Sequence, residues 1–387
     1  MKELIIFNSN DKKQIALIEN EELVEKYEED ENNKSIEGNI YIGKVQNVIP
    51  GLQSAFVNIG EKKNAFIHIK DILPKVDITK EVQIETKPIN QLIKPGDPII
   101  VEVKKEAVDK KGPRLSTHLS ITSRFVVFMP NANFITISQK IENETEKERL
   151  KNIVKKYLPK GTGAIIRTTA EGCLEETIKK DIQKSIERWK KIQLKKVEKY
   201  PQKIYDKGGI LRKTLVDLVD NKLDKIVLQD KNDLEKIETI LDEIGATTKI
   251  EIDNQILEKH TLKKQIESLN SNKIWLKSGA FITIDKTEAL VAIDVNSGKY
   301  IGNKDVEETI LSVNLEAAKE ISKQIRLRDI SGIIIIDFID MKKDENKQAV
   351  INEIKENSKK DRSRVQVEEF TKLNLMEITR KHINSKK

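Results

Sequence analysis

Two apolar runs that each end in an aspartate, separated by one long amphipathic segment, constrain the fold of this chain most strongly. Residues 289–294 read ALVAID, and residues 332–337 read GIIIID. Such runs are typical of strands buried on both faces of a sheet. Between them, residues 305–328 place apolar side chains at helical spacing, with acids in the first turn and arginines in the last. The pattern predicts a strand, a helix and a second strand.

The two aspartates at the strand ends are candidate metal ligands. A right-handed crossover would make the strands parallel neighbours and place Asp294 beside Asp337 at their carboxyl ends. Adjacent carboxylates repel each other unless a proton or a cation lies between them. Oxygen ligands without a nearby histidine or cysteine favour Mg²⁺ or Mn²⁺, and Asn296 adds a neutral amide. Such a metal supports phosphodiester hydrolysis. The alternative is that each aspartate caps the turn after its strand.

The region over residues 38–118 predicts a small β-barrel. Short stretches of period-two alternation are separated by turns such as Pro50-Gly51, which gives about five strands, the pattern of an OB-type barrel. Phe56 and Phe66 occur there among several lysines. Single-stranded nucleic acid uses this mixture for base stacking and phosphate contact. The alternative is that both phenylalanines belong to the barrel core.

The other segments predict mixed α/β structure. A strand pair is expected over residues 1–18, followed by an acidic arm over residues 21–37. Strands are expected near residues 125–129 and 163–166, with a long amphipathic helix over residues 174–200. Residues 205–270 show an α/β pattern without obvious chemistry: helices near residues 211–223 and 233–244, and strands near residues 225–228 and 249–252.

Composition limits the classes of protein that remain. The 387 residues are enough for about two to four domains. The single cysteine, Cys173, excludes an intramolecular disulfide and a zinc site built from paired thiolates within this chain. No apolar run approaches the ~18 residues of a membrane span, and the start has no signal peptide pattern. We therefore expect a cytoplasmic protein without a membrane segment.

Three stretches resemble the catalytic core of the ribonuclease E/G family. They are ALVAIDVNSGKY, DVEETILSVNLEAAKEISKQIRLRDISGIIIIDFIDM and DRSRVQVEEFTKLNLMEITRK, and the resemblance extends over essentially residues 1–383. It implies a Mg²⁺-dependent endoribonuclease that acts in RNA processing and decay. The expected substrate is single-stranded, A/U-rich RNA, cut to leave 5′-monophosphate and 3′-hydroxyl ends, with stimulation by a 5′-monophosphate on the substrate.

The resemblance also implies a domain arrangement. Residues 1–35 and 205–270 would form a discontinuous RNase H-like structural subdomain. An S1-type OB RNA-binding domain (residues 36–118) and a 5′-monophosphate sensor domain (residues 119–204) would interrupt it. A DNase I-like α/β catalytic subdomain would follow over residues 271–387.

Carried over position by position, the family's motifs assign roles to individual residues. Asp294 and Asp337 match the Mg²⁺ carboxylates, and Asn296 matches an asparagine that hydrogen-bonds near the scissile phosphate. Arg364 matches an arginine that contacts the RNA backbone. The remaining matches are the RNA-clamping residues of the barrel, Phe56, Phe66 and Lys111, and the residues that recognise a 5′-monophosphate, Arg167, Thr168 and Val127.

The chain departs from the family pattern at three places. The resemblance implies a CxxC zinc link shortly after Arg380, and this motif does not occur before Lys387. We therefore do not expect the family's zinc-bridged dimer or its usual tetramer from these residues, and a homo-oligomer formed without zinc is the open alternative. Ser123 stands where the family has a glycine, which would narrow the 5′ pocket, and Gln139 replaces an arginine. Two other functions are considered: a non-catalytic RNA-binding or scaffold protein, and a Mg²⁺-dependent phosphohydrolase acting on small nucleotides.

Overall fold

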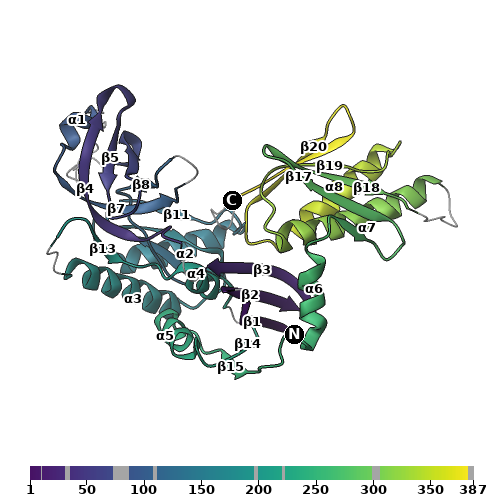
Figure 1. Cartoon of the computed structure of the whole chain (residues 1–387), viewed down its shortest axis with the longest axis horizontal. Coiled ribbons are helices and arrows are strands. Elements are labelled where there is room, and N and C mark those ends of the chain that lie inside the picture. Colours follow the sequence, from purple (N-terminus) through teal and green to yellow (C-terminus); the bar gives the residue numbers. More distant parts are fainter. Residues whose placement is uncertain are drawn as a thin grey trace.

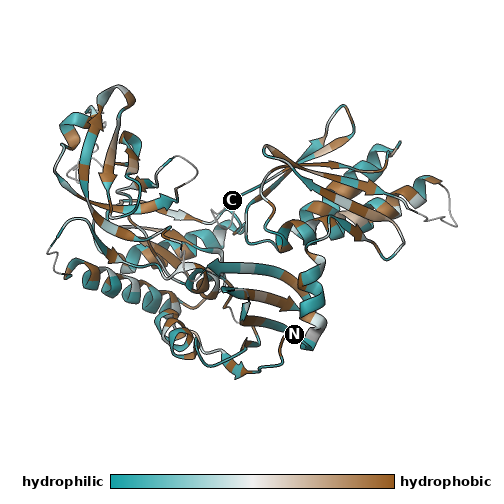
Figure 2. Cartoon of the chain, viewed as in Figure 1, coloured by the Kyte–Doolittle hydropathy of each residue, from teal (hydrophilic) through white to brown (hydrophobic). Residues whose placement is uncertain are grey.

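Four β-sheets organise the part of the chain that the structure describes (Figure 1). The structure is a computed structural model, and it describes residues 1–9, 11–30, 35–72, 87–107, 111–195, 199–219, 223–298 and 306–381. Each sheet packs against an apolar cluster. Apolar residues are concentrated along the strands (Figure 2). No helix within these residues combines the length and apolarity needed to cross a membrane.

The first sheet joins segments from distant parts of the sequence. Its order is β15-β14-β1-β2-β3, with β1 Lys2–Ser9, β2 Lys12–Glu19, β3 Glu22–Asp30, β14 Lys225–Leu228 and β15 Lys249–Ile252. Because β1 pairs in parallel with β14, the N-terminal strands share one sheet with residues 225–252. Helices α4 (Gly209–Leu218) and α5 (Leu234–Ile244) cover one face, and α6 (Leu262–Ser268) packs on the other.

The acidic stretch is not a separate arm, contrary to the expectation from its charge. Residues 22–30 form β3 at the edge of the first sheet. Glu25 and Glu29 are only 1% and 2% exposed. Glu29 accepts a 2.7 Å hydrogen bond from the backbone N–H of Ile210, and Glu25 pairs with Arg326. These acids tolerate burial because distant residues supply their partners.

The second sheet is a closed five-stranded barrel, which confirms the predicted OB-type fold. Its strands follow the order β4-β5-β6-β8-β7, and β7 pairs again with β4: β4 Ile40–Ile49, β5 Ser54–Asn58, β6 Ala65–His68, β7 Pro98–Lys105 and β8 Arg114–Ser116. Short helical turns, η1 (Pro50–Leu52), η2 (Ile69–Asp71) and α1 (Ile89–Leu92), connect them. Strand β13 (Gln202–Tyr205) is added beside β4.

The third sheet is small and is covered by two helices. Its order is β11-β12-β10-β9, with β9 Ile121–Thr122, β10 Val126–Met129, β11 Ile135–Ile137 and β12 Gly163–Ile166. The helical turn η3 (Thr168–Ala170) follows β12. Helices α2 (Glu144–Tyr157) and α3 (Glu175–Gln193) pack their apolar faces on the sheet. Helix α3 is shorter than predicted, since it ends before residue 200.

The fourth sheet contains the predicted strand, helix and strand. Its order is β16-β17-β18-β19-β21-β20, with β16 Lys273–Trp275, β17 Phe281–Lys286, β18 Leu290–Asn296, β19 Gly332–Asp337, β20 Val365–Phe370 and β21 Leu375–Arg380. The turn η4 (Lys259–Thr261) precedes α6. Helix α7 (Val306–Leu327) connects β18 to β19, and those two strands are parallel. Helix α8 (Asp344–Ser358) follows β19, and both helices cover the same face.

The prediction that β18 and β19 are buried on both faces is wrong. Exposure alternates along β18: Ile293 and Val295 are buried under the helices, whereas Ala292 and Asp294 are exposed. On β19, Ile333 is 50% exposed. The sheet is antiparallel apart from one pair, and such sheets commonly present one face to solvent. The two aspartates lie on that exposed face.

Candidate active site

Asp294 and Asp337 are direct neighbours at the ends of two parallel strands. They are register partners in the β18–β19 pair, so one strand spacing of about 4.8 Å separates their backbones. Both side chains are exposed. Asn296, also on β18, donates a short hydrogen bond from its amide Nδ2 to Oδ2 of Asp294. The predicted catalytic residues therefore lie together on one sheet face, and the cap-only alternative does not account for this pairing.

The aromatic residues of the barrel also lie together. Phe56 on β5 and Phe66 on β6 are register partners, with ring centroids 6.2 Å apart in an edge-to-face arrangement. Both are half-buried, and neither belongs to the apolar cluster inside the barrel. Exposed Lys111 precedes Gly112, where a Cβ would lie 1.9 Å from the carbonyl oxygen of Asn64. That close approach places the backbone next to Lys111 beside the start of β6, the strand that carries Phe66.

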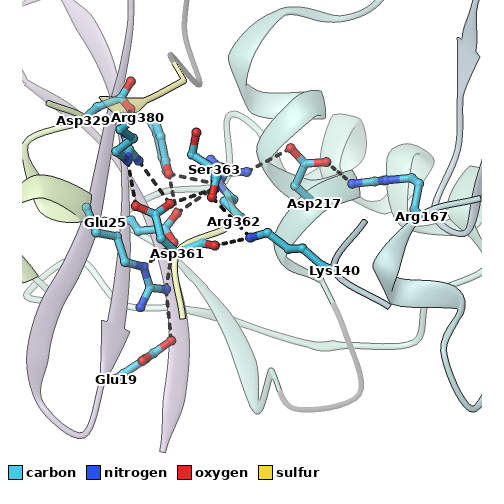
Figure 3. A network of polar contacts seen from close by, with 12 residues as sticks. Glu19, Glu25, Lys140, Arg167, Asp217, Asp329, Asp361, Arg362, Ser363 and Arg380 are labelled. Carbon is cyan, nitrogen blue, oxygen red and sulfur yellow. Dashed lines mark hydrogen bonds and ion pairs between the residues drawn. The ribbon is translucent and has the colours of Figure 1, made fainter. Parts of the chain in front are cut away.

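Arg167 is held by protein groups in this structure. Its NH1 donates to the carbonyl oxygens of Ser123 (2.8 Å) and Arg124 (3.3 Å), and its NH2 forms an ion pair with Asp217 of α4. Asp217 also pairs with Arg362 at 2.9 Å (Figure 3). The candidate 5′-phosphate arginine is thus connected through Asp217 to a second arginine, Arg362.

The other candidate sensor residues lie close to Arg167 in sequence or register. The hydroxyl of Thr168 is 2.8 Å from that of Ser138. Val127 is half-buried and is the register partner of Ile165 on β12. The Ser123 hydroxyl donates to Asp181 of α3, and the narrowing of the pocket stays a prediction.

Arg364 lies far from the two aspartates. It is exposed and directly precedes Val365, which is the register partner of Arg380. Arg380 is in turn opposite Gly332, the first residue of β19, whereas Asp337 is the last residue of that strand. Along the strand alone, this corresponds to about 17 Å. The preceding loop residues instead accept hydrogen bonds from Lys140, which donates to the carbonyls of Asp361 and Ser363. The structure therefore does not place Arg364 with the catalytic candidates.

Comparison with known proteins identifies the family. The model of the ribonuclease E/G family matches residues 120–383, and that of the S1 RNA binding domain matches residues 34–118. The chain belongs to the ribonuclease E/G family. It is 37% identical to ribonuclease G of Haemophilus influenzae and 35% identical to that of Escherichia coli K12, over 98% of this chain and 79% of each relative. Ribonuclease E of Nostoc sp. is 33% identical over 95% of this chain and 56% of that protein.

The aspartate pair of this ribonuclease E/G family member fits a divalent cation. Burial, followed by the negative charges of Asp294 and Asp340, raises the pKa of Asp337 above its ordinary value. A cation between the carboxylates would relieve this repulsion. Within the described residues, no group of three or more His, Cys, Asp and Glu side chains forms a metal site. Two carboxylates would leave the other positions around a Mg²⁺ ion to the waters or phosphate oxygens that this ion usually keeps as ligands.

Two residues next to the candidate sites were missed by the sequence interpretation. Asp340 follows Asp337 in the stretch DFID, so a search for acids after the strand would have found it. Asp181 accepts hydrogen bonds from the N–H groups of Phe125 (3.0 Å) and Val126 (3.2 Å), next to the carbonyls that bind Arg167. It is an ordinary helix acid in the sequence. No local signal marks it.

Gly298, two residues after Asn296, packs closely on the backbone of Gly279, which gives a first prediction. Its φ is +61°, and a Cβ there would lie 2.5 Å from the carbonyl oxygen of Gly279. We expect Gly298→Ala to lower RNA cleavage about tenfold, because the strain and the close contact at residue 298 would shift the backbone next to Asn296. The control is Gly279→Ala, where φ is +91° but a Cβ would meet nothing within 4 Å. Equal cleavage rates for both variants would contradict the role of the contact.

Proposed function

We propose that this chain is a Mg²⁺-dependent endoribonuclease that cuts single-stranded, A/U-rich RNA and leaves 5′-monophosphate and 3′-hydroxyl ends. Membership of the ribonuclease E/G family makes it an endoribonuclease. The observation that carries the metal-dependent mechanism is the register pairing of Asp294 with Asp337 on an exposed sheet face. We also propose that it acts in cytoplasmic RNA processing and decay.

Each residue at the site has a separate role in the proposed hydrolysis. Asp294 and Asp337 would hold the ion through their carboxylate oxygens. When bound, Mg²⁺ activates water and stabilises the charge that develops on the phosphoryl oxygens. The Asn296 amide orients the Asp294 carboxylate through its hydrogen bond. Because all three side chains project from strands, their geometry is largely set before RNA binds.

The S1 barrel supplies the RNA-binding surface of the proposed enzyme. The S1 match over residues 34–118 supports RNA binding by this region. Phe56 and Phe66 present half-buried rings on adjacent strands, and in our proposal the exposed Lys111 adds a positive charge to this surface. Aromatic rings next to a cation suit unpaired bases and the phosphates that join them. The remaining subdomains correspond, in our proposal, to RNase H-like, sensor and DNase I-like units.

A cleavage assay tests the proposed function. The substrate is a fluorescently labelled A/U-rich oligonucleotide with a 5′-monophosphate. We expect cleavage with Mg²⁺, its loss in excess EDTA and its return on adding Mg²⁺. We also expect the upstream product to carry a 3′-hydroxyl and thus to be extended by a polymerase that requires one. Salt-sensitive binding without cleavage would instead support the non-catalytic scaffold, and cleavage confined to mononucleotide substrates would support the small-nucleotide hydrolase.

The sensor assignment gives a second prediction. We expect Arg167→Ala to reduce the preference for 5′-monophosphate over 5′-hydroxyl RNA about tenfold, since hydrogen bonds to charged groups contribute about 1.5–3 kcal/mol each. Asp217→Asn should keep or increase the preference, because it frees the guanidinium from its ion pair. The measurement is the ratio of kcat/KM for the two RNAs.

Arg149→Ala is the charge-matched control for the sensor prediction. Arg149 pairs with Glu146 at 2.6 Å on α2 and donates to the carbonyl oxygen of Cys173 at 3.0 Å, and neither of these residues is a partner of Arg167. We expect it to leave the preference unchanged. An unchanged ratio in Arg167→Ala would show that this protein does not use Arg167 to recognise the 5′ end.

A further inference from the structure

A second aromatic surface lies on the same sheet face as the two aspartates. Trp275 of edge strand β16 is 61% exposed, and its ring centroid is 5.2 Å from that of Phe281 on β17. The ammonium of Lys273 lies over both rings, 4.4 Å from the Trp275 centroid and 3.6 Å from the Phe281 centroid. The three side chains form a compact cluster of two rings and one cation.

Strand register connects this cluster to the catalytic candidates. Trp275 is opposite Phe281, which is opposite Asn296 on β18. In the next row, Lys273 is opposite Thr283, and Thr283 is opposite Asp294. Trp275 and Lys273 on β16 are therefore two strand spacings, about 10 Å, from β18 with Asp294, and one further spacing from β19 with Asp337, on the same face. A nucleotide next to a phosphate at the aspartate pair can reach the cluster.

Gly298, just after β18, touches the hairpin that carries the cluster. Gly298 packs so closely on the carbonyl oxygen of Gly279 that a Cβ would lie 2.5 Å from it. Gly279 belongs to the turn between β16 and β17. The cluster and β18 therefore lie on adjacent strands of one sheet, with a direct backbone contact between them, rather than on independent loops.

Packing alone does not explain the exposed tryptophan. Between Lys273 and Trp275, Ile274 points to the other face and packs against the apolar cluster under the helices. Trp275 keeps most of its surface in solvent, so its contribution to folding through burial is small. A large exposed aromatic ring on a sheet face suits contact with another molecule.

We propose that Trp275, Phe281 and Lys273 form a stacking platform for an RNA base next to the scissile phosphate. The proposal rests on the proposed function, because the aspartate pair defines where that phosphate lies. The base would stack on the indole, and Lys273 would move from the rings to the neighbouring phosphate. RNA is favoured over a second copy of the chain as the molecule that binds this platform. The cluster carries a positive charge, and its residues are aligned across the strands with Asn296 and Asp294 of the candidate metal site.

Intrinsic fluorescence tests the platform without relying on cleavage. The chain has two tryptophans, so Trp189→Phe leaves Trp275 as the sole tryptophan. In this background with Asp337→Asn added, a 5′-monophosphorylated A/U ten-nucleotide RNA should quench the Trp275 emission in a saturable manner. Absence of quenching in RNA-bound protein would overturn the platform. Emission that changes with protein concentration without RNA would also overturn it, since it would indicate an interface between copies.

Cleavage kinetics provide the second readout. We expect Trp275→Ala to lower kcat/KM about tenfold, equivalent to about 1.4 kcal/mol, and Trp275→Phe to lower it much less. Lys273→Gln should reduce the salt dependence of RNA binding by about one phosphate contact. Ile333→Ala is the control, because Ile333 is exposed on the same sheet at the opposite end of β19. Equal kcat/KM for Trp275→Ala and Ile333→Ala would overturn the platform.

The two proposals fail in different ways. Saturable quenching in a protein whose wild type does not cleave RNA would retain the platform as an RNA-binding site and reject the proposed function. Cleavage that depends on Asp294 and Asp337 but is unaffected by Trp275→Ala, with no quenching, would retain the function and reject the platform.

Discussion

Asp337→Asn is expected to lower the rate of RNA cleavage by about a thousandfold or more at saturating Mg²⁺. Asparagine keeps the shape of the side chain but removes one of the two charges that would hold the ion. Metal stabilisation of a phosphoryl transition state is worth several kcal/mol, and each 1.36 kcal/mol corresponds to a factor of ten in rate. Asp294→Asn should have a similar effect, since the two residues are register partners. Single-turnover cleavage of the labelled RNA measures both.

The same sheet face offers a matched control for the loss of a carboxylate. Asp285 on β17 is exposed, and its register partner is Ala292 rather than either catalytic candidate. We expect Asp285→Asn to keep most of the activity. Asp337→Asn should also keep RNA binding and stability, because Asp337 is exposed to solvent and because partial desolvation, followed by the negative charges of Asp294 and Asp340, raises the pKa of its carboxyl group and so disfavours the charged form that asparagine replaces. Undiminished cleavage by Asp294→Asn or Asp337→Asn would disprove the site assignment.

The central α/β motif could be predicted from sequence because its signals are local. The apolar runs, the helical spacing of residues 305–328 and the strand-end aspartates are all continuous in the chain. The handedness of the crossover then placed Asp294 beside Asp337. The barrel was predictable for the same reason, since its turns and alternating strands are short-range features. The exposed side of β18 was missed because small Ala292 reads as apolar, although its side chain faces solvent.

The polar contacts between distant segments could not be predicted from sequence. Glu25 of β3 pairs with Arg326 of α7 and with Arg362, more than three hundred positions away, and Asp217 of α4 links Arg362 to Arg167 (Figure 3). Each of these residues looks like an ordinary surface charge in its own window. A local charge count therefore described an acidic arm where the fold forms a paired strand. Only the tertiary structure supplies the partners that make buried charges tolerable.

Arg380→Met is expected to destabilise the unit around the fourth sheet by about 3–5 kcal/mol, the usual cost of removing one partner from a buried ion pair. The Arg380 side chain is fully buried and donates to both oxygens of Asp361, at 2.7 and 3.2 Å, and to Asp329 at 2.6 Å. Methionine fills a similar volume but leaves the Asp361 carboxylate, which is 4% exposed, without its cation. The midpoint of urea unfolding, followed by circular dichroism, measures the loss.

An exposed arginine–aspartate pair serves as the control for this prediction. It distinguishes the effect of burying the ion pair from the effect of losing any paired arginine. Arg114 pairs with Asp71 at 2.8 Å, but its side chain is 50% exposed, so Arg114→Met should cost no more than about 1 kcal/mol. Arg380→Met should also speed proteolysis near residues 361–364. The Asp361 carboxylate accepts a hydrogen bond from Arg380 and its carbonyl accepts one from Lys140, so the loss of Arg380 should loosen this segment. Equal destabilisation by the two variants would show that Arg380 acts only through its charge. A larger effect of Arg380→Met together with faster proteolysis would show that it holds the loop whose carbonyls bind Lys140 and which carries Arg364.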